Sequence, residues 1–287
     1  MDKWRKIMNI KTYRTSKERL FADYIKAEKE RADKKIYSLD LPEIGRLTAY
    51  LYQPEDKSRM ADQPILAIFH GGGFVLGYPE QEGPYARKIA ERLGCLVVVL
   101  DYKLAPEFPF PLPITSSYDF LSQFMQEKSN LGVSSEELIL LGHSAGGNLV
   151  LAIEQLNQER QELTIKRVIA NYPVLDARPW LRNVQAWSRM QDYISWYIKK
   201  LEEVNNSLVS PILSDRLNLS KLCLLGAEQD PLCSASRAFF QKNPKITYKE
   251  YEGAQHGFTH FWYQEFDAEK SVEAWEDVMR FIKEGKL

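Results

Sequence analysis

The sequence predicts an α/β protein built on a mostly parallel β-sheet. Short apolar, β-branched runs alternate with longer stretches of helical periodicity, as in successive βαβ units. Runs in the middle of the chain, such as CLVVVL at residues 95–100, are almost continuously apolar, which is typical of strands covered on both faces. With 287 residues, 44% of them hydrophobic, the whole chain, 1–287, is expected to form a single domain.

The alternation defines the expected elements in order. Strands are expected near residues 34–40, 46–53, 64–69, 95–100, 137–142, 167–173, 221–226 and 246–251. Helices are expected near residues 83–92, 114–129, 146–160, 233–242 and 267–284. The segment 105–113 contains four prolines and is expected to be a stiff, non-helical loop.

Two segments do not fit this alternation. Residues 1–33 have the pattern of a charged helix that precedes the first strand. Residues 176–209 form a long insertion rich in Trp and Tyr. Long insertions on α/β scaffolds commonly form lids or the walls of binding sites.

Composition and charge exclude several classes of function. A net charge of −1 gives no electrostatic reason to expect a nucleic-acid partner. The three cysteines are too few and too unevenly spaced for a disulfide framework or a zinc cluster, and we expect no metal site. No apolar run approaches the roughly 20 residues that span a bilayer, so stable membrane insertion is not expected.

The N-terminus carries no secretory signal, which favours a cytoplasmic location. The first twenty residues contain seven Lys and Arg against two acidic residues. This excess fits a helix with a solvated basic face, and contact with an anionic membrane is the alternative. The oligomeric state is left open, a homodimer included.

Ser144 lies in the sequence GHSAGG, between an expected strand and an expected helix. A sharp turn at this point strains the serine backbone and lifts its hydroxyl above the edge of the sheet. Glycines two positions to either side allow the strand and the helix to pass closely. The pattern therefore indicates a nucleophilic serine, although a helix-capping serine with packing glycines has a similar local sequence.

A nucleophilic serine needs a histidine base that is oriented by a carboxylate. His256 lies in a glycine-flanked loop after the last strand and is preferred to His260, which is surrounded by aromatic residues. Asp230 follows the preceding strand and is preferred to Glu228. The chain order serine, aspartate, histidine is the one expected on this kind of sheet. A helix-capping role for Asp230 is the alternative.

A run of three glycines, 71–73, follows the expected strand at 64–69. Consecutive glycines cost backbone entropy, so they indicate a place where N–H groups approach a ligand without obstruction. No spacing typical of phosphate-binding loops is present. We expect the N–H groups of Gly72, Gly73 and Ala145 to form an oxyanion hole.

Five motifs together resemble the hormone-sensitive lipase-like branch of the α/β-hydrolases. They are HGGG at 70–73, DYKLAPE at 101–107, GHSAGG at 142–147, DPL at 230–232 and HGF at 256–258. The resemblance implies an α/β-hydrolase fold with an eight-stranded, mostly parallel sheet, helices on both faces and a helical cap from about 1–33 and 176–209. It also implies hydrolysis of small carboxylic esters without a cofactor. Ser144, Asp230 and His256 match the family's triad, and Gly72, Gly73 and Ala145 match its oxyanion donors.

Two positions depart from the family's pattern. His143 stands where the family often has aspartate, and Lys103 replaces a frequent arginine. We expect His143 to change the hydrogen bonds that hold the HGGG loop, and His70 to anchor that loop. Because GHSAGG also occurs in formamide hydrolases, an amide or formamide hydrolase remains an alternative. A non-catalytic small-molecule receptor on the same fold is a second alternative.

The expected partner is a small ester substrate, selected by the cap. Aromatic side chains of the insertion offer an apolar wall, although residues at this spacing also pack a helix onto its neighbours. These candidate substrate contacts are Trp180, Trp187, Tyr193, Trp196 and Tyr197. A covered pocket favours short acyl chains.

Overall fold

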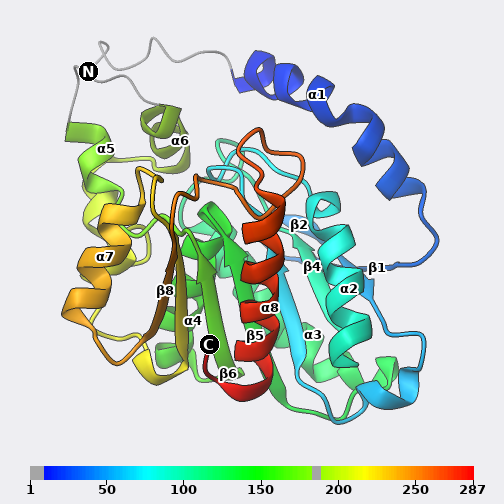
Figure 1. The fold of residues 1–287 in the computed structure, drawn as a ribbon. Helices are drawn as coiled ribbons and strands as arrows, with labels where there is room; N and C mark the ends of the chain where they lie inside the picture. Colours follow the sequence, from blue (N-terminus) through cyan, green and yellow to red (C-terminus); the bar gives the residue numbers. More distant parts are fainter. Residues whose placement is uncertain (1–9, 183–188) are drawn as a thin grey trace.

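The computed structural model describes residues 10–182 and 189–287, which form an eight-stranded sheet flanked by helices (Figure 1). The strand order is β1-β2-β4-β3-β5-β6-β7-β8. Strand β2 is antiparallel to β1 and β4, and the remaining pairs are parallel. The strands are β1 Lys35–Leu41, β2 Gly45–Tyr52, β3 Ile65–Phe69, β4 Val97–Asp101, β5 Glu137–His143, β6 Thr164–Asn171, β7 Leu222–Ala227 and β8 Thr247–Tyr251. The predicted fold class is confirmed, and the eight predicted strands occur within a few residues of their expected positions.

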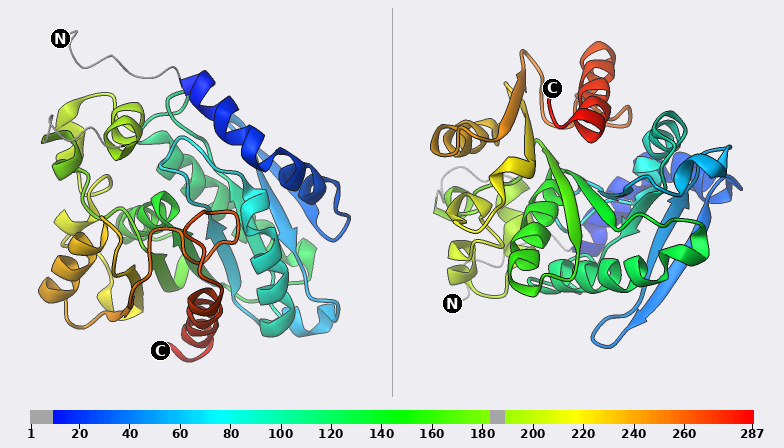
Figure 2. Two further views of the ribbon diagram at one scale, coloured as in Figure 1. Left: turned by 45° about the horizontal axis from the view of Figure 1, so that its top comes forward. Right: turned by 90° about the horizontal axis from the view of Figure 1, so that it is seen from below.

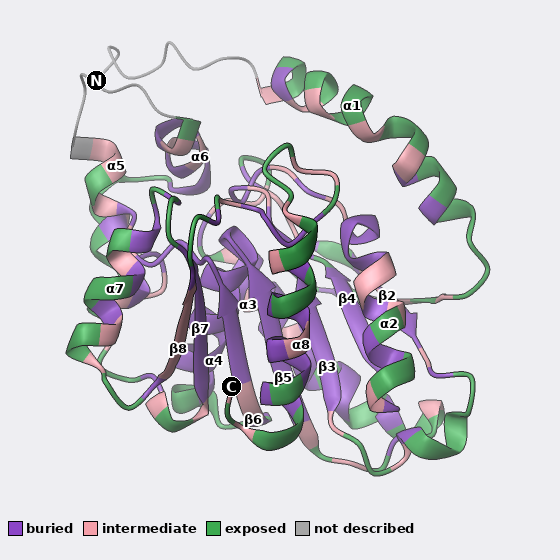
Figure 3. Cartoon of the chain, viewed as in Figure 1, coloured by how far each residue is buried: buried purple, intermediate pink, exposed green. Residues whose placement is uncertain are grey.

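The central strands are buried on both faces, as their apolar sequences predict (Figure 3). Successive side chains of β5 alternate between two cores, with Leu140 in one and Leu141 in the other. The first core lies under α3 and α4, and the second lies under α2 and α8 (Figure 2). Because both faces are covered, the ends of the strands remain as the natural place for a site.

The helices that cover the sheet lie close to their predicted positions. They are α2 Gly83–Leu93, α3 Leu112–Glu127, α4 Ala145–Arg160, α7 Cys233–Lys242 and α8 Ala268–Glu284. The expectation of a non-helical segment through residue 113 is wrong at its end, because α3 already begins at Leu112. Pro113 lies in the first turn of α3, where the missing N–H of proline costs no intrahelical hydrogen bond.

Helix α1, Ile10–Glu30, and the insertion border the same end of the sheet, above the strands in Figure 1. The insertion contains α5 Arg178–Arg182, α6 Arg189–Tyr197 and the 3₁₀ turn η4 Leu201–Asn205. The hydroxyl groups of Tyr13 and Tyr193 lie 2.5 Å apart and join α1 to α6. Among the residues described, no helix is both long and apolar enough to cross a membrane.

Candidate active site

Ser144 occupies the turn between β5 and α4. Its φ of 55° and ψ of −114° lie in a region that a residue with a side chain rarely adopts. The turn holds this conformation because its glycines allow very close contacts. A Cβ atom on Gly142 would lie 2.1 Å from the carbonyl oxygen of Gly146, and one on Gly146 would lie 2.1 Å from that of Phe69. The glycine pattern is therefore a steric requirement of the turn.

The turn brings Ser144 next to residues that follow two other strands. His256 lies in the loop after β8, and its Nε2 is 2.9 Å from Ser144 Oγ. Its Nδ1 is 2.6 Å from Oδ2 of Asp230, which follows β7. The Asp230 side chain is 2% exposed and its Oδ1 accepts the Leu232 N–H, whereas the His256 side chain is 37% exposed. A serine hydroxyl, an imidazole and a carboxylate thus form one hydrogen-bonded chain.

The two rival residues have other partners. The exposed Glu228 accepts a hydrogen bond from the Gly253 N–H at 2.7 Å. His260 is 2% exposed, and its Nε2 lies 3.1 Å from Oε2 of Glu82. Neither side chain belongs to the chain of hydrogen bonds that begins at Ser144.

The glycine loop after β3 runs directly past the serine. A Cβ atom on Gly71 would lie 3.5 Å from Ser144 Cβ. Gly72 and Gly73 have φ values of 140° and 61°, and their N–H groups make no hydrogen bond with any residue that the structure describes. The N–H of Ala145, the first residue of α4, has no intrahelical acceptor. These free donors near Ser144 are the groups that an oxyanion requires.

His70 fixes the start of this loop. The side chain is fully buried, Nδ1 donates to the Gly71 carbonyl at 2.8 Å, and the ring stacks on Tyr102 with centroids 4.3 Å apart. The Tyr102 hydroxyl donates in turn to the His70 carbonyl at 2.9 Å. Burial lowers the pKa of His70 to about 4, so this imidazole stays neutral and has a structural part.

Ser144 and His256 open onto a cavity of about 640 Å³, which is within the usual range for small-molecule sites. Of the predicted aromatic wall, Tyr193 lines this cavity. Trp196 and Tyr197 are buried in the core instead, and Tyr197 stacks on Phe74 with ring centroids 4.0 Å apart. Trp180 also packs against the core, and Trp187 lies outside the described residues.

The sequence analysis did not identify several residues that line the cavity. Three come from one face of α1, and four come from the loop after β8. They are Lys17, Leu20, Phe21, Trp262, Tyr263, Gln264 and Glu265. The spacing of the first three, which places them on one side of a helix, and the aromatic run after His260 were the available signals.

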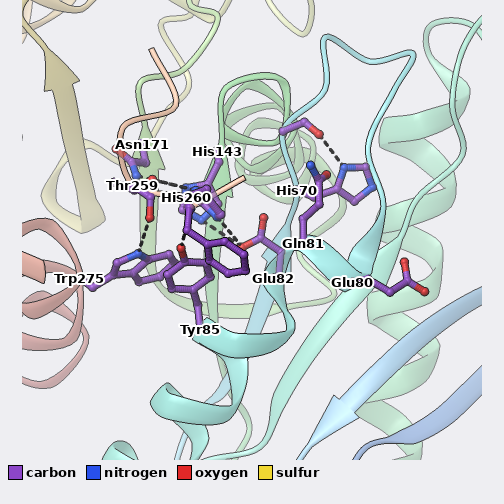
Figure 4. A network of polar contacts seen from close by, with 12 residues as sticks. His70, Glu80, Gln81, Glu82, Tyr85, His143, Asn171, Thr259, His260 and Trp275 are labelled. Atoms are coloured by element: carbon purple, nitrogen blue, oxygen red, sulfur yellow. Dashed lines mark hydrogen bonds and ion pairs between the residues drawn. The ribbon is translucent and has the colours of Figure 1, made fainter. Parts of the chain in front are cut away.

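His143 does not act on the glycine loop in the way we expected. Its Nδ1 lies 3.1 Å from the side-chain nitrogen of Asn171, and its Nε2 lies 3.6 Å from Oε2 of Glu82 (Figure 4). These polar contacts therefore connect β5 with β6 and with the segment before α2. Burial lowers the pKa of the His143 imidazole to about 3 and raises that of the Glu82 carboxyl.

Comparisons with known proteins agree with this fold. A family profile described as the alpha/beta hydrolase fold matches residues 66–260, a range that includes the glycine loop and all three residues of the hydrogen-bonded chain. The solved structure of a hyperthermophilic esterase from the archaeon Pyrobaculum calidifontis is similar, with a TM-score of 0.82 and 27% identity over 96% of this chain and 91% of that one.

Two related esterases are similar in sequence over a smaller part of this chain. An arylesterase of Saccharolobus solfataricus is 29% identical over 61% of this chain and 60% of its own length. An acetyl esterase of Salmonella schwarzengrund is 28% identical over 76% of this chain and 71% of its own length. The chain thus spans less than two thirds of the arylesterase. The resemblance to the hormone-sensitive lipase-like branch is confirmed.

Proposed function

Because this chain belongs to the α/β-hydrolase fold family, we propose that it is a serine esterase that cleaves short-chain carboxylic esters through an acyl-enzyme. The observation that carries the proposal is the pair of contacts made by His256, 2.9 Å to Ser144 Oγ and 2.6 Å to Asp230 Oδ2. A base that contacts both a nucleophile and an orienting carboxylate is the arrangement used in acyl transfer.

In the first half of the reaction, His256 Nε2 takes the proton of Ser144 as Oγ attacks the ester carbonyl. The N–H groups of Gly72, Gly73 and Ala145 stabilise the negative charge that develops on the carbonyl oxygen. The imidazolium then gives its proton to the alcohol, which leaves. Asp230 holds Nδ1–H throughout and stabilises the charged imidazole.

In the second half, His256 activates a water molecule that attacks the acyl group on Ser144. The oxyanion donors act again, and the proton returns to Ser144 when the acid is released. The 37% exposure of the His256 side chain supports this step, because water can reach the imidazole.

The cavity and the names of two relatives support small esters as substrates. It is bounded by α1 on one side and by α6 on the other, with Phe21 and Tyr193 among its walls. A volume of about 640 Å³ accommodates a small ester between these helices. The names arylesterase and acetyl esterase of two relatives support small esters as substrates.

Two measurements test the proposal. A fluorophosphonate probe should label the wild-type protein and leave Ser144→Ala unlabelled. p-Nitrophenyl acetate and butyrate should be hydrolysed far faster than the palmitate ester. Absence of labelling would favour a non-catalytic receptor. Faster cleavage of an N-formyl amide than of any ester would favour a formamide hydrolase, and faster cleavage of palmitate would reject the short-chain assignment.

A further inference from the structure

A second polar cluster lies in the same cavity as Ser144 but takes no part in the proposed reaction. It consists of Glu82, directly before α2, His143, at the end of β5, and His260, in the loop after β8 (Figure 4). Each of the three side chains is at most 2% exposed. Carboxylate and imidazole groups that are buried this deeply need compensating partners.

Two imidazole nitrogens converge on one carboxylate oxygen. Oε2 of Glu82 lies 3.1 Å from His260 Nε2 and 3.6 Å from His143 Nε2. One nitrogen or oxygen atom from each residue lies within 4.8 Å of the other two. Ligands about 2.0–2.1 Å from a tetrahedral zinc ion are roughly 3.3 Å apart, so the two measured separations are close to those of a zinc site.

The contact of His143 is too long for a hydrogen bond. Its Nε2 is buried and has no hydrogen-bond partner among the described residues, although it points toward Glu82. Buried polar atoms of this kind are rare and call for an explanation. An ion between the three residues would satisfy this nitrogen.

The outward nitrogens of both rings have polar neighbours, as in metal-binding histidines. His260 Nδ1 lies 2.8 Å from the Thr259 hydroxyl and 3.2 Å from that of Tyr172. His143 Nδ1 faces the side-chain amide of Asn171, whose Oδ1 is buried and has no partner in the part of the chain that the structure describes. Exchanging the oxygen and nitrogen of that amide would let Oδ1 accept Nδ1–H and leave Nε2 free to bind a metal.

We propose that Glu82, His143 and His260 form a Zn²⁺ site with a fourth position open to the cavity. Two imidazoles and one carboxylate are a ligand set that suits Zn²⁺ better than Mg²⁺ or Ca²⁺, which prefer oxygen. The cavity gives an ion a path to the site, because all three residues line it.

An ion at this site would also affect the reaction, a consequence that rests on the proposed function. The Tyr172 side chain contacts His260 and lies with its ring centroid 5.0 Å from that of His256. Tyr172 thus links the site to His256, and a dication at the site disfavours the protonated form of His256, on which the proposed reaction depends. Zn²⁺ should therefore slow ester hydrolysis.

The test measures binding first. The full chain, treated with a chelator and then passed through a desalting column, is titrated with ZnCl₂, and bound zinc and thermal midpoint are recorded. We expect one equivalent of zinc and a raised midpoint. Glu82→Gln and His260→Gln should each weaken zinc binding by about 100-fold or more, since the loss of an outer partner alone costs 10–100-fold.

The matched control is His256→Asn. It removes the more exposed imidazole of the cavity, which is the competing zinc ligand, and should keep the full equivalent. Less than stoichiometric binding by the wild type, equal affinity in the wild type and Glu82→Gln, or loss of binding in His256→Asn would overturn the proposal. If Glu82→Gln fails to fold, His260→Gln gives the same reading, and Thr259→Val, which removes an outer partner, should weaken zinc binding by roughly 10–100-fold.

Activity is the second readout. Zn²⁺ should lower kcat for p-nitrophenyl butyrate in the wild type and not in Glu82→Gln. Should the protein hydrolyse no ester at all, the zinc content and the thermal midpoint still decide whether the site exists. The two proposals therefore fail separately.

Discussion

The chain has four histidines, three of which line one cavity, yet their surroundings differ sharply. The His256 side chain is 37% exposed and contacts a carboxylate at 2.6 Å. His70, His143 and His260 are at most 2% exposed, and burial lowers their pKa values to about 4, 3 and 3. Proton transfer requires an imidazole that can be charged as well as neutral. Exposure, together with contacts to both the serine hydroxyl and a carboxylate, distinguishes the base from the three buried histidines.

The carboxylates of Asp230 and Glu82, which contact these histidines, also differ in their surroundings. Asp230 accepts the Leu232 N–H and faces an imidazole that reaches solvent. Glu82 is buried between His143 and His260, and desolvation raises the pKa of its carboxyl. The first pair is arranged to move a proton, and the second is arranged to hold position or to bind a cation.

The strongest test of this contrast makes the same substitution, histidine to glutamine, at His256 and at His260. His256→Gln should lower kcat/KM for p-nitrophenyl butyrate by about 10⁵-fold or more, because the nucleophile loses its base. His260→Gln should lower the thermal midpoint instead and reduce activity far less, since it disturbs a buried contact with Glu82. Both are assayed with a chelator present. The contrast is wrong if His260→Gln loses as much activity as His256→Gln at an unchanged midpoint.

The next largest loss of activity is expected on replacing Asp230, the carboxylate that contacts His256. Asp230→Asn should reduce kcat by about 10⁴-fold, because an amide favours the wrong imidazole tautomer and does not stabilise the imidazolium. Glu228→Gln is the matched control, an exposed acid two residues earlier that bonds to the Gly253 N–H. It should stay within about threefold of wild type by the same assay. Equal losses of kcat in both variants would contradict the role of Asp230 as the carboxylate that orients His256.

A smaller loss is expected in the glycine loop. A Cβ atom on Gly73 would lie 2.2 Å from the Tyr193 ring, and a φ of 61° disfavours alanine, so we expect Gly73→Ala to displace the loop and its N–H. We expect kcat to fall by about 10²–10³-fold, the usual cost of one oxyanion donor. Gly132→Ala controls for backbone strain, because its φ of 82° is also positive and its Cβ would meet no atom within 4 Å. A similar loss of activity in the control would contradict the oxyanion assignment.

The sequence predicted the hydrogen-bonded chain well because each member follows a recognisable strand. Ser144, Asp230 and His256 come after β5, β7 and β8, and parallel strands bring their carboxyl ends to one edge of the sheet. The glycines around Ser144 carried a further signal, since their contacts exclude any side chain. Motif and topology therefore agreed on the same three residues.

The cavity walls were predicted less well, and the reason is physical. Helix α6 carries aromatic side chains toward both the core and the cavity, so periodicity alone does not tell which of them lines the cavity. Tyr197 packs on Phe74, whereas Tyr193, one turn earlier, reaches the cavity. Glu82 gave no signal at all, because an isolated acid between two motifs has the sequence pattern of a surface residue.

His70 provides the smallest and most quantitative test, through stability instead of activity. Its pKa is about 6.5 in an unfolded chain and about 4 when buried. Between these values the unfolded chain holds a proton that the folded chain does not, so the free energy of unfolding falls as the pH falls through this window. By pH 5 the loss from His70 should be about 2 kcal/mol relative to pH 8.

Urea unfolding of the wild type and His70→Asn at pH 8 and pH 5 isolates this contribution. The other buried histidines act in the same direction and the raised pKa of Glu82 acts in the opposite one, but both remain in the variant and cancel in the difference. His70→Asn should be less stable than the wild type at pH 8 and should lose about 2 kcal/mol less on acidification. Parallel losses in the two proteins would mean that His70 is protonated in the folded state, and that burial does not separate the structural histidines from His256.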